Sequence, residues 1–412
     1  MAEDKPLVVK LLDGIRTVDD FERMHESLKI QNDQLLSNFV AENIADNTGQ
    51  FYRGIKERIY PDRSIYQGGF QGNSREGAGL YIYPSGDKYF GSWMNDKFNG
   101  FGFYVYPNHE RYEGGLVSGL REGKGKFYAF NGGVYDGEFS RDQRNGYGVY
   151  TYFGTREKYE GYWKNNTKNG KGVFYYAFGD VYDGEYMDNE RNGYGRLTYA
   201  DGSYYEGEWK KDLTHGQGVL KTADGLIYKG DWVRGRKHGR GILEADPTHF
   251  NNKERNEKYD GDWRGNEKNG YGEMKYANGD AYLGEWRDGL RFGRGIYHFS
   301  NGDEYNGSWE NDHMHKVGSL KYSNGERYNG QWENGIKSGN GVFEYENGDC
   351  YEGGWWNGQR YGEGTYIWKT GEKYVGNWEG DLMDGVGVFG YGGKEVKATL
   401  AGGKIVGTRN VN

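Results

Sequence analysis

The sequence predicts an all-β fold: an elongated, single-layer array of antiparallel β-hairpins, preceded by a short N-terminal helical segment. Three observations predict it. A Tyr-x-Gly element recurs fourteen times at nearly constant spacing, buried-type residues alternate within each copy, and the 412 residues include 73 Gly beside 39 Tyr, 19 Phe and 12 Trp. Glycine is costly to order on folding and aromatic rings bury large areas, so we expect the glycines at fixed places beside rings.

The tyrosine of each element defines position 1 of a repeat. Eleven of the thirteen intervals between successive tyrosines are 23 residues, one is 24 and one is 31. A constant period of this length is the signature of a repeat array. The fourteen starts are Tyr66, Tyr89, Tyr112, Tyr135, Tyr159, Tyr182, Tyr205, Tyr228, Tyr259, Tyr282, Tyr305, Tyr328, Tyr351 and Tyr374.

Each repeat reads as two strands joined by a turn. Tyr, Gly and usually Trp occupy positions 1, 3 and 5, and Gly, Gly, an apolar residue and usually an aromatic residue occupy positions 12, 14, 16 and 18. This period of two predicts strands with one buried face, and segments such as 95–99 are expected to hold the turn. We interpret the glycines at positions 3, 12 and 14 as a floor without side chains, on which the rings lie.

Ten of the twelve tryptophans fall at one position of the repeat. Trp368 fills an aromatic slot at position 18, and Trp356 alone is out of register. The other ten form a structural aromatic row at position 5: Trp93, Trp163, Trp209, Trp232, Trp263, Trp286, Trp309, Trp332, Trp355 and Trp378.

The unit Y-x-G-x-W followed by G-x-G resembles the MORN (membrane occupation and recognition nexus) repeat across residues 66–396. The resemblance implies an elongated single-layer sheet of hairpins, which agrees with the alternation described above. Some copies depart from the pattern. Lys316 replaces the first Gly of G-x-G in repeat eleven, and four repeats replace Trp by Phe70, Leu116, Phe139 or Tyr186.

The flanking segments differ from the repeats. Residues 1–50 hold ten acids and five bases, and so contribute −5 to the net charge of −8. Within them, a helix is expected from Thr17, a suitable N-cap, to about Ala45, and it either caps the first hairpins or binds a partner. Residues 51–65 and 397–412 are expected to cap the array. An insertion within 246–258 is expected to form a protruding loop.

The composition argues against several classes of function. The lone Cys350 excludes a disulfide scaffold, no apolar run is long enough for a membrane helix, and the N-terminus does not read as a secretory signal. The array without its N-terminal segment carries only −3, which disfavours nucleic acid. His313 and His315, the only close histidine pair, read as solvated turn residues. We therefore expect no catalytic residues, no cofactor and no metal, and a soluble, cytoplasmic protein that is not an enzyme; a cytoskeletal location is implied by the resemblance alone.

Two polar rows could bind partners. Acids recur at positions 2 and 4 of the outward face, for example Asp136 with Glu138, Asp183 with Glu185, Glu206 with Glu208, and Asp260 with Asp262. The second row, at position 10, is expected at the hairpin tips, either as solvated or acid-paired residues or as a ladder for acidic proteins or anionic lipid. It comprises Arg75, Arg121, Arg144, Lys168, Arg191, Lys237, Lys268, Arg291, Lys337 and Arg360.

The function expected first is non-enzymatic scaffolding by an extended ribbon. Among MORN proteins without a catalytic domain, the chain looks most like the radial spoke head components of cilia and flagella, which implies an axonemal location and spoke or other cytoskeletal subunits as partners. A membrane-associated, phosphoinositide-binding module and a targeting subunit for a separate enzyme are the alternatives. Outward apolar residues that could anchor a partner are Phe90, Tyr162, Leu283 and Val375.

Overall fold

The computed structural model describes residues 55–248 and 257–410. Within these ranges the chain forms antiparallel strands and no helix, which confirms the predicted all-β hairpin fold. The helix predicted at 17–45 lies outside the described residues, as does most of the predicted loop within 246–258.

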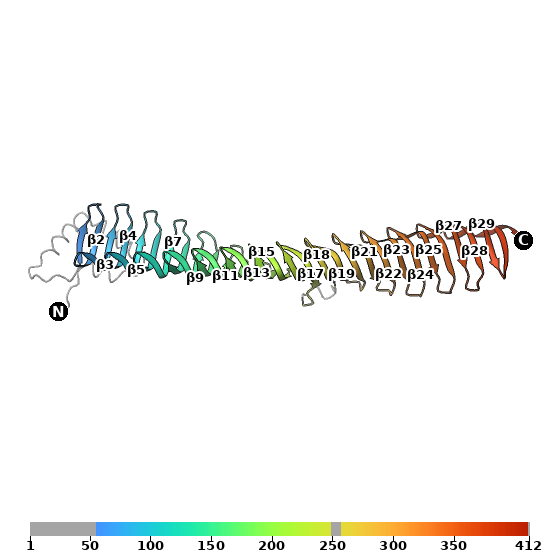
Figure 1. Ribbon diagram of the computed structural model, residues 1–412, viewed down its shortest axis with the longest axis horizontal. Helices are drawn as coiled ribbons and strands as arrows, with labels where there is room; N and C mark the ends of the chain where they lie inside the picture. Colours follow the sequence, from blue (N-terminus) through green and yellow to red (C-terminus); the bar gives the residue numbers. More distant parts are fainter. Residues whose placement is uncertain (1–54, 249–256, 411–412) are drawn as a thin grey trace, which may run out of the picture. The chain divides into compact units, whose positions relative to one another are not determined.

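The described chain divides into two compact units. The first extends to Ala200 and takes in Lys210–Asp212, and the second contains Asp201–Trp209 and everything from Leu213 onward. Within each unit, Figure 1 shows the strands side by side in chain order.

The strands of the first unit pair each with the next in sequence. They are β1 (Ile55–Ile59), β2 (Ile65–Gln71), β3 (Ser74–Ile82), β4 (Lys88–Met94), β5 (Lys97–Val105), β6 (Arg111–Val117), β7 (Leu120–Tyr128), β8 (Val134–Ser140), β9 (Gln143–Thr151), β10 (Lys158–Lys164), β11 (Thr167–Tyr175), β12 (Val181–Met187) and β13 (Glu190–Thr198).

The second unit continues the pattern, and β30 and β31 add one further hairpin after the last repeat. Its strands are β14 (Tyr204–Lys210), β15 (Leu213–Lys221), β16 (Leu226–Val233), β17 (Arg236–Ala245), β18 (Lys258–Arg264), β19 (Glu267–Lys275), β20 (Ala281–Arg287), β21 (Leu290–His298), β22 (Glu304–Glu310), β23 (His313–Lys321), β24 (Arg327–Glu333), β25 (Ile336–Glu344), β26 (Cys350–Trp356), β27 (Gln359–Ile367), β28 (Lys373–Glu379), β29 (Leu382–Tyr391), β30 (Lys394–Ala401) and β31 (Lys404–Asn410).

The hairpin turns are tighter than the five-residue turn that the sequence predicts. β4 ends at Met94 and β5 begins at Lys97, so only Asn95 and Asp96 form the loop, with φ of 48° and 63°. Two consecutive residues with positive φ match the right-handed twist of paired strands, and Asn, Asp and Gly adopt this conformation at the lowest cost. Position 10 therefore lies in the second strand of the hairpin and not at its tip.

The tyrosine at position 1 lies on a glycine floor, as the sequence predicts for positions 3 and 14. In the hairpin β20–β21, Gly284 and Gly295 face each other across the strands, and a Cβ on either would collide with the Tyr282 side chain. The Tyr282 hydroxyl donates a hydrogen bond of 2.9 Å to the carbonyl oxygen of Glu285, beside the β-bulge at positions 3 to 5. This need for a hydroxyl explains why every repeat begins with tyrosine and not phenylalanine.

The same tyrosine hydrogen bond, from position 1 to the carbonyl of position 4, occurs in all fourteen repeats. A buried carbonyl without a partner destabilises a fold, so the hydroxyl and the floor act together.

The interpretation of position 12 as part of this floor is wrong. Gly293 has a φ of 63°, and a Cβ there would meet the Glu285 carboxylate and not a ring. In thirteen repeats the residue at position 12 is a glycine with positive φ, so backbone conformation selects it.

Repeat eleven tests this reading, because Lys316 occupies position 12 with a φ of 57°. Replacing Lys316 with glycine is expected to raise the free energy of unfolding by roughly 0.5 to 1 kcal/mol, because it relieves left-handed strain in a residue with a Cβ. Urea denaturation followed by tryptophan fluorescence measures the change. Lys321→Gly, in the same strand but without positive φ, should instead lower stability, and a gain in both variants would contradict the explanation.

Tryptophan at position 5 joins each hairpin to the one before it. Trp309 Nε1 donates to the carbonyl of Gly295 at 3.2 Å, and its ring meets Tyr282 and Tyr305 edge-on, with centroids 5.4 and 5.2 Å apart. The indole N–H contacts the same carbonyl of the preceding repeat in eight further cases, those of Trp93, Trp163, Trp232, Trp263, Trp286, Trp332, Trp355 and Trp378.

Candidate interaction surface

The ten basic residues predicted as an exposed ridge do not lie at the hairpin tips. They sit at position 10, two residues after the turn, and all are half-buried on the face that carries the rings. Five of the arginine side chains are only 17 to 21% exposed. The predicted position at the hairpin tips is therefore wrong, because this row packs between hairpins, and the alternative of acid-paired residues is confirmed for five of the ten. The residues concerned are Arg75, Arg121, Arg144, Lys168, Arg191, Lys237, Lys268, Arg291, Lys337 and Arg360.

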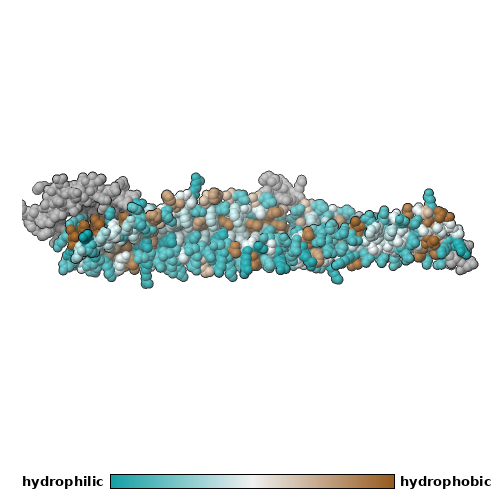
Figure 2. All heavy atoms as spheres, turned by 90° about the horizontal axis from the view of Figure 1, so that it is seen from above, coloured by the Kyte–Doolittle hydropathy of each residue, from teal (hydrophilic) through white to brown (hydrophobic). Residues whose placement is uncertain are grey.

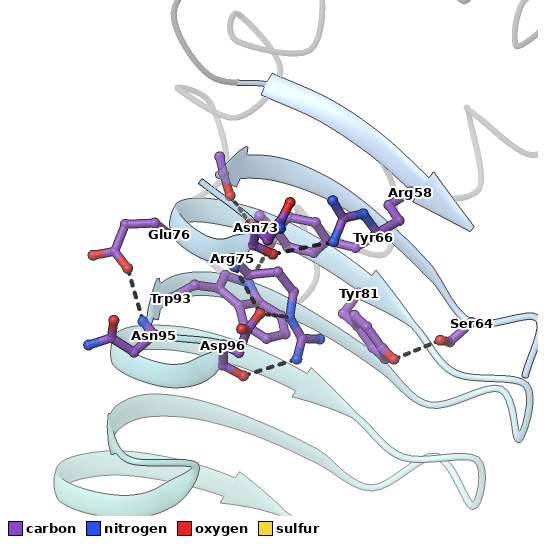
Figure 3. Close-up of polar contacts among 12 residues, drawn as sticks. Arg58, Ser64, Tyr66, Asn73, Arg75, Glu76, Tyr81, Trp93, Asn95 and Asp96 are labelled. Carbon is purple, nitrogen blue, oxygen red and sulfur yellow. Dashed lines mark hydrogen bonds and ion pairs between the residues drawn. The ribbon is translucent and has the colours of Figure 1, made fainter. Parts of the chain in front are cut away.

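Each of these cations packs over the position 1 tyrosine ring of its own repeat, and most also pack over the ring at position 5 of the following hairpin. The guanidinium carbon of Arg75 lies 4.2 Å from the Trp93 ring centroid, and Figure 3 shows the two side chains next to each other. Arg144, Arg291 and Arg360 lie 4.3 to 4.4 Å from their tryptophans. A cation over an aromatic face is stabilised by the ring quadrupole, which lets these groups be half-buried.

Arginine at position 10 also binds position 8 of the next hairpin. Asp96 Oδ1 accepts the backbone N–H of Arg75 at 2.9 Å and its Nε at 3.0 Å, and the Asp96 carbonyl accepts Nη2 at 3.0 Å (Figure 3). The Asp96 N–H returns a hydrogen bond to the Arg75 carbonyl. These bonds hold the pKa of Asp96 below its ordinary value. One carboxylate thus closes the joint between two hairpins.

The residues at positions 10 and 8 are matched along the chain. Every aspartate at position 8 faces an arginine of the preceding repeat; the five pairs are Arg75–Asp96, Arg121–Asp142, Arg191–Asp212, Arg291–Asp312 and Arg360–Asp381. The other five cations face asparagine or glycine, which leaves them without a carboxylate at this joint. They are Arg144, Lys168, Lys237, Lys268 and Lys337. Burial lowers the pKa of all five.

Removing the aspartate of an arginine–aspartate pair is expected to lower the stability of the array measurably. Asp312→Ala is expected to lower the free energy of unfolding by about 2 kcal/mol, because it strands a half-buried guanidinium and a backbone N–H. Asp312→Asn, which keeps the acceptor oxygen, should cost less. Asn311→Ala, in the same turn and also at positive φ, controls for backbone strain. Equal losses in Asp312→Ala and Asn311→Ala, measured by chemical denaturation, would contradict a role for the carboxylate.

The acids of the outward face have structural partners. Asp262 Oδ2, at position 4, accepts the backbone N–H of Tyr271 at 2.9 Å, and Glu285 does the same for Arg294 at 3.0 Å. These N–H groups follow the positive-φ glycine, so the carboxylate satisfies a donor at the bulge. At position 2, Asp260 pairs with Arg240 at 3.1 Å. Other predicted acids lie opposite lysine in register, namely Asp136, Glu138 and Glu185. In both cases the N–H at the bulge belongs to the residue nine positions after the acid. The sequence contains this spacing, but it was not used to predict the contact.

The outward apolar residues behave differently from one another. Phe90 is buried at 8% exposure and stacks with Phe103, which corrects its prediction as an exposed anchor. Tyr162, Leu283 and Val375 are exposed, as expected. On the face shown in Figure 2, hydrophobic residues are scattered among hydrophilic ones. The sequence analysis missed the most exposed rings, Phe130, Phe153 and Phe178, which lie in loops between repeats.

The remaining candidates for chemistry are modest. His315 Nε2 lies 3.3 Å from a carboxylate oxygen of Glu310, within a single hairpin. Burial raises the pKa of the Cys350 thiol, which keeps it protonated at neutral pH. In the ranges that the structure covers, no three His, Cys, Asp or Glu residues form a group that could hold a metal, and no helix could cross a membrane.

Comparison with known families identifies the repeat. A family model described as the MORN repeat matches fourteen successive segments: 66–88, 89–111, 112–134, 135–153, 159–181, 182–204, 205–227, 228–244, 259–281, 282–304, 305–327, 328–350, 351–373 and 374–393. No curated protein sequence matches the chain.

Several solved structures are similar to parts of the chain, all at low TM-scores. The SAS-4 (dCPAP) TCP domain of Drosophila melanogaster, in complex with a proline-rich motif of Ana2 (dSTIL), is 12% identical, with a TM-score of 0.25 over 40% of this chain and 85% of that one. The TCP10 domain of Danio rerio CPAP is 12% identical, with a TM-score of 0.21 over 61% and 92%. Likenesses this weak establish neither fold nor function.

Proposed function

The chain belongs to the MORN repeat family, and from that membership we propose that it is a non-enzymatic scaffold that assembles other proteins along its repeats. The observation that carries the proposal is the repeated joint. Each described hairpin binds the next through a backbone hydrogen bond between positions 8 and 10, and in most joints also through a ring and a polar side chain. Stability of this kind adds up from neighbour to neighbour, and suits a long, regularly spaced binding surface.

We further propose that the scaffold belongs to the radial spoke head of the ciliary axoneme. Its support is the resemblance of the sequence to the radial spoke head components among MORN proteins without a catalytic domain. Spoke or other cytoskeletal subunits are the partners that this placement implies.

Fractionation of ciliated cells tests the placement. Tagged protein is expected to stay with axonemes after detergent extraction of the membrane, and to co-purify with spoke subunits after high-salt release. Complete recovery in the detergent-soluble fraction would count against the axonemal role, while leaving scaffolding elsewhere to be tested by the proteins that co-purify.

Binding to anionic lipid is the second candidate function, because five cations lack a carboxylate at their joint. Their half-burial on the ring face weighs against it. Sedimentation with phosphoinositide-containing vesicles tests it, with Arg144→Glu and Lys168→Glu as the variants. A parent protein that stays in the supernatant would remove this candidate.

A further inference from the structure

We propose that the joint between Lys268 and Gly289 is a binding site for a carboxylate side chain on an acidic segment of a partner protein. This site presupposes the scaffold role proposed above and names the chemistry of one partner. It lies wholly within the second unit, on the ring face, where β19 meets the turn between β20 and β21.

The next joint along the chain shows how a carboxylate sits in this place. Asp312 Oδ1 accepts both the backbone N–H and the Nε of Arg291, each at 2.9 Å, and the Asp312 carbonyl accepts Nη2 at 2.9 Å. Four other arginine joints repeat the contact between Nε and the carboxylate at 3.0 to 3.3 Å. The fold therefore contains a carboxylate-binding geometry that it uses five times for its own aspartates.

At Lys268 the donors are present but the carboxylate is absent. The ammonium nitrogen lies 4.4 Å from the Trp286 ring centroid, comparable to the place of Arg291 over Trp309. Gly289 keeps the backbone bond to the Lys268 carbonyl at 2.9 Å, with a φ of 84°. A Cβ built on Gly289 would meet nothing within 4 Å. The place of the first side-chain carbon of an aspartate is thus open at this joint.

The charge at this joint is not neutralised by an ion pair within the described ranges. Asp312 and Glu257 act on Lys268 only at longer range, and Arg291 opposes them. A half-buried cation without a counter-ion is costly, so a carboxylate arriving from outside gains more here than at an exposed lysine. The occupied slots hold a side-chain carboxylate together with a backbone N–H, which favours an acidic peptide over other anions.

A second open charge lies one hairpin earlier. The amide oxygen of Asn266 accepts the Lys237 N–H at 2.9 Å, but it brings no charge to the Lys237 ammonium, which lies 5.0 Å from the Trp263 ring centroid. Successive hairpins are separated by two strands, about 10 Å. In a polyproline II segment, which has three residues per turn and rises about 3.1 Å per residue, side chains three residues apart point the same way and are separated by about 9 Å. The partner segment that fits is a polyproline II stretch with acids at i and i+3.

The test uses the full chain and a peptide that carries an uncharged fluorophore, two glutamates at i and i+3 and no other charge. At low salt it is expected to bind about fivefold more tightly than the same peptide with glutamines, which corresponds to about 1 kcal/mol. The double variant Lys268→Arg/Gly289→Asp should abolish this preference, because it supplies the internal carboxylate. Since it copies the Arg291–Asp312 joint, it should fold, as its thermal unfolding can verify.

The reverse double variant makes the complementary prediction. Arg291→Lys/Asp312→Gly opens a third slot beside Lys268 and should strengthen binding of a peptide with a third glutamate at i+6. An unchanged preference in Lys268→Arg/Gly289→Asp would overturn the assignment, and so would binding to phosphatidylserine vesicles in place of the peptide. If the peptide fails while the protein still co-purifies with axonemal subunits, the site is wrong and the scaffold role stands.

Discussion

Replacing Gly295 with alanine is expected to destabilise its part of the array by about 3 kcal/mol. A Cβ at this position would collide with the hydroxyl and the ring of Tyr282, which is fully buried. The ring cannot retreat, because it packs edge-on against Trp286 and Trp309, with centroids 5.2 and 5.4 Å away. Relief requires loss of the hydrogen bond from Tyr282 to the Glu285 carbonyl, so the overpacking cost adds to that of an unpaired buried group.

Gly325→Ala is the matched control for this change. Gly325 has a φ of 96° and open space around it, so alanine there costs only backbone strain, about 1 kcal/mol. Chemical denaturation compares the two variants. If Gly325→Ala costs as much as Gly295→Ala, the conformational freedom of glycine, and not the floor under the ring, would explain the glycine at position 14.

Truncation of Trp309 to alanine is expected to cost about 4 kcal/mol. The change removes the bond to the Gly295 carbonyl, two edge-on contacts with Tyr282 and Tyr305, and the ring beneath the Arg291 guanidinium. Because Trp309 belongs to one hairpin and its partners Tyr282, Arg291 and Gly295 to the preceding one, most of the loss falls on the joint between them.

Trp356 supplies the control within the same residue type. It is 64% exposed and out of register with the row, so Trp356→Ala should change stability by less than about 0.5 kcal/mol. Hydrogen exchange shows where each variant opens, since a repeat array can unfold locally. Protection lost evenly along the chain, and not around β21 to β23, would argue against a local joint.

The sequence predicted the fold well because each repeat shows the same pattern fourteen times. Alternation fixed the buried face, and the rows of Tyr282 and Trp286 identified the rings. The role of Gly293 was misread because a glycine chosen for its backbone conformation and one chosen for space look alike in a sequence. Lys316 was the clue that distinguished them: an amino acid with a long side chain can adopt positive φ, but it cannot lie under a ring.

The candidate site was harder to predict. Arg291 was assigned to a tip because the turn was expected to be five residues long, and the two-residue turn moves it into the strand. Its partner Asp312 lies in the next repeat, so the pair is not seen when the repeats are aligned position by position. It is seen only when position 10 of each repeat is compared with position 8 of the following repeat. That comparison shows that every aspartate at position 8 faces an arginine and that every lysine at position 10 faces asparagine or glycine, while Arg144 faces Asn166.

The matched joints make the order of the repeats matter. A 23-residue segment could be duplicated or lost without disturbing the glycine floor, yet the new neighbours would carry the wrong charges. Loss of residues 282–304 would place Lys268 against Asp312 and remove the opening at Gly289. A whole repeat can therefore be gained or lost without a charge mismatch only where the residues at positions 10 and 8 of the new neighbours still match. The identity of each repeat thus depends on the repeat before it.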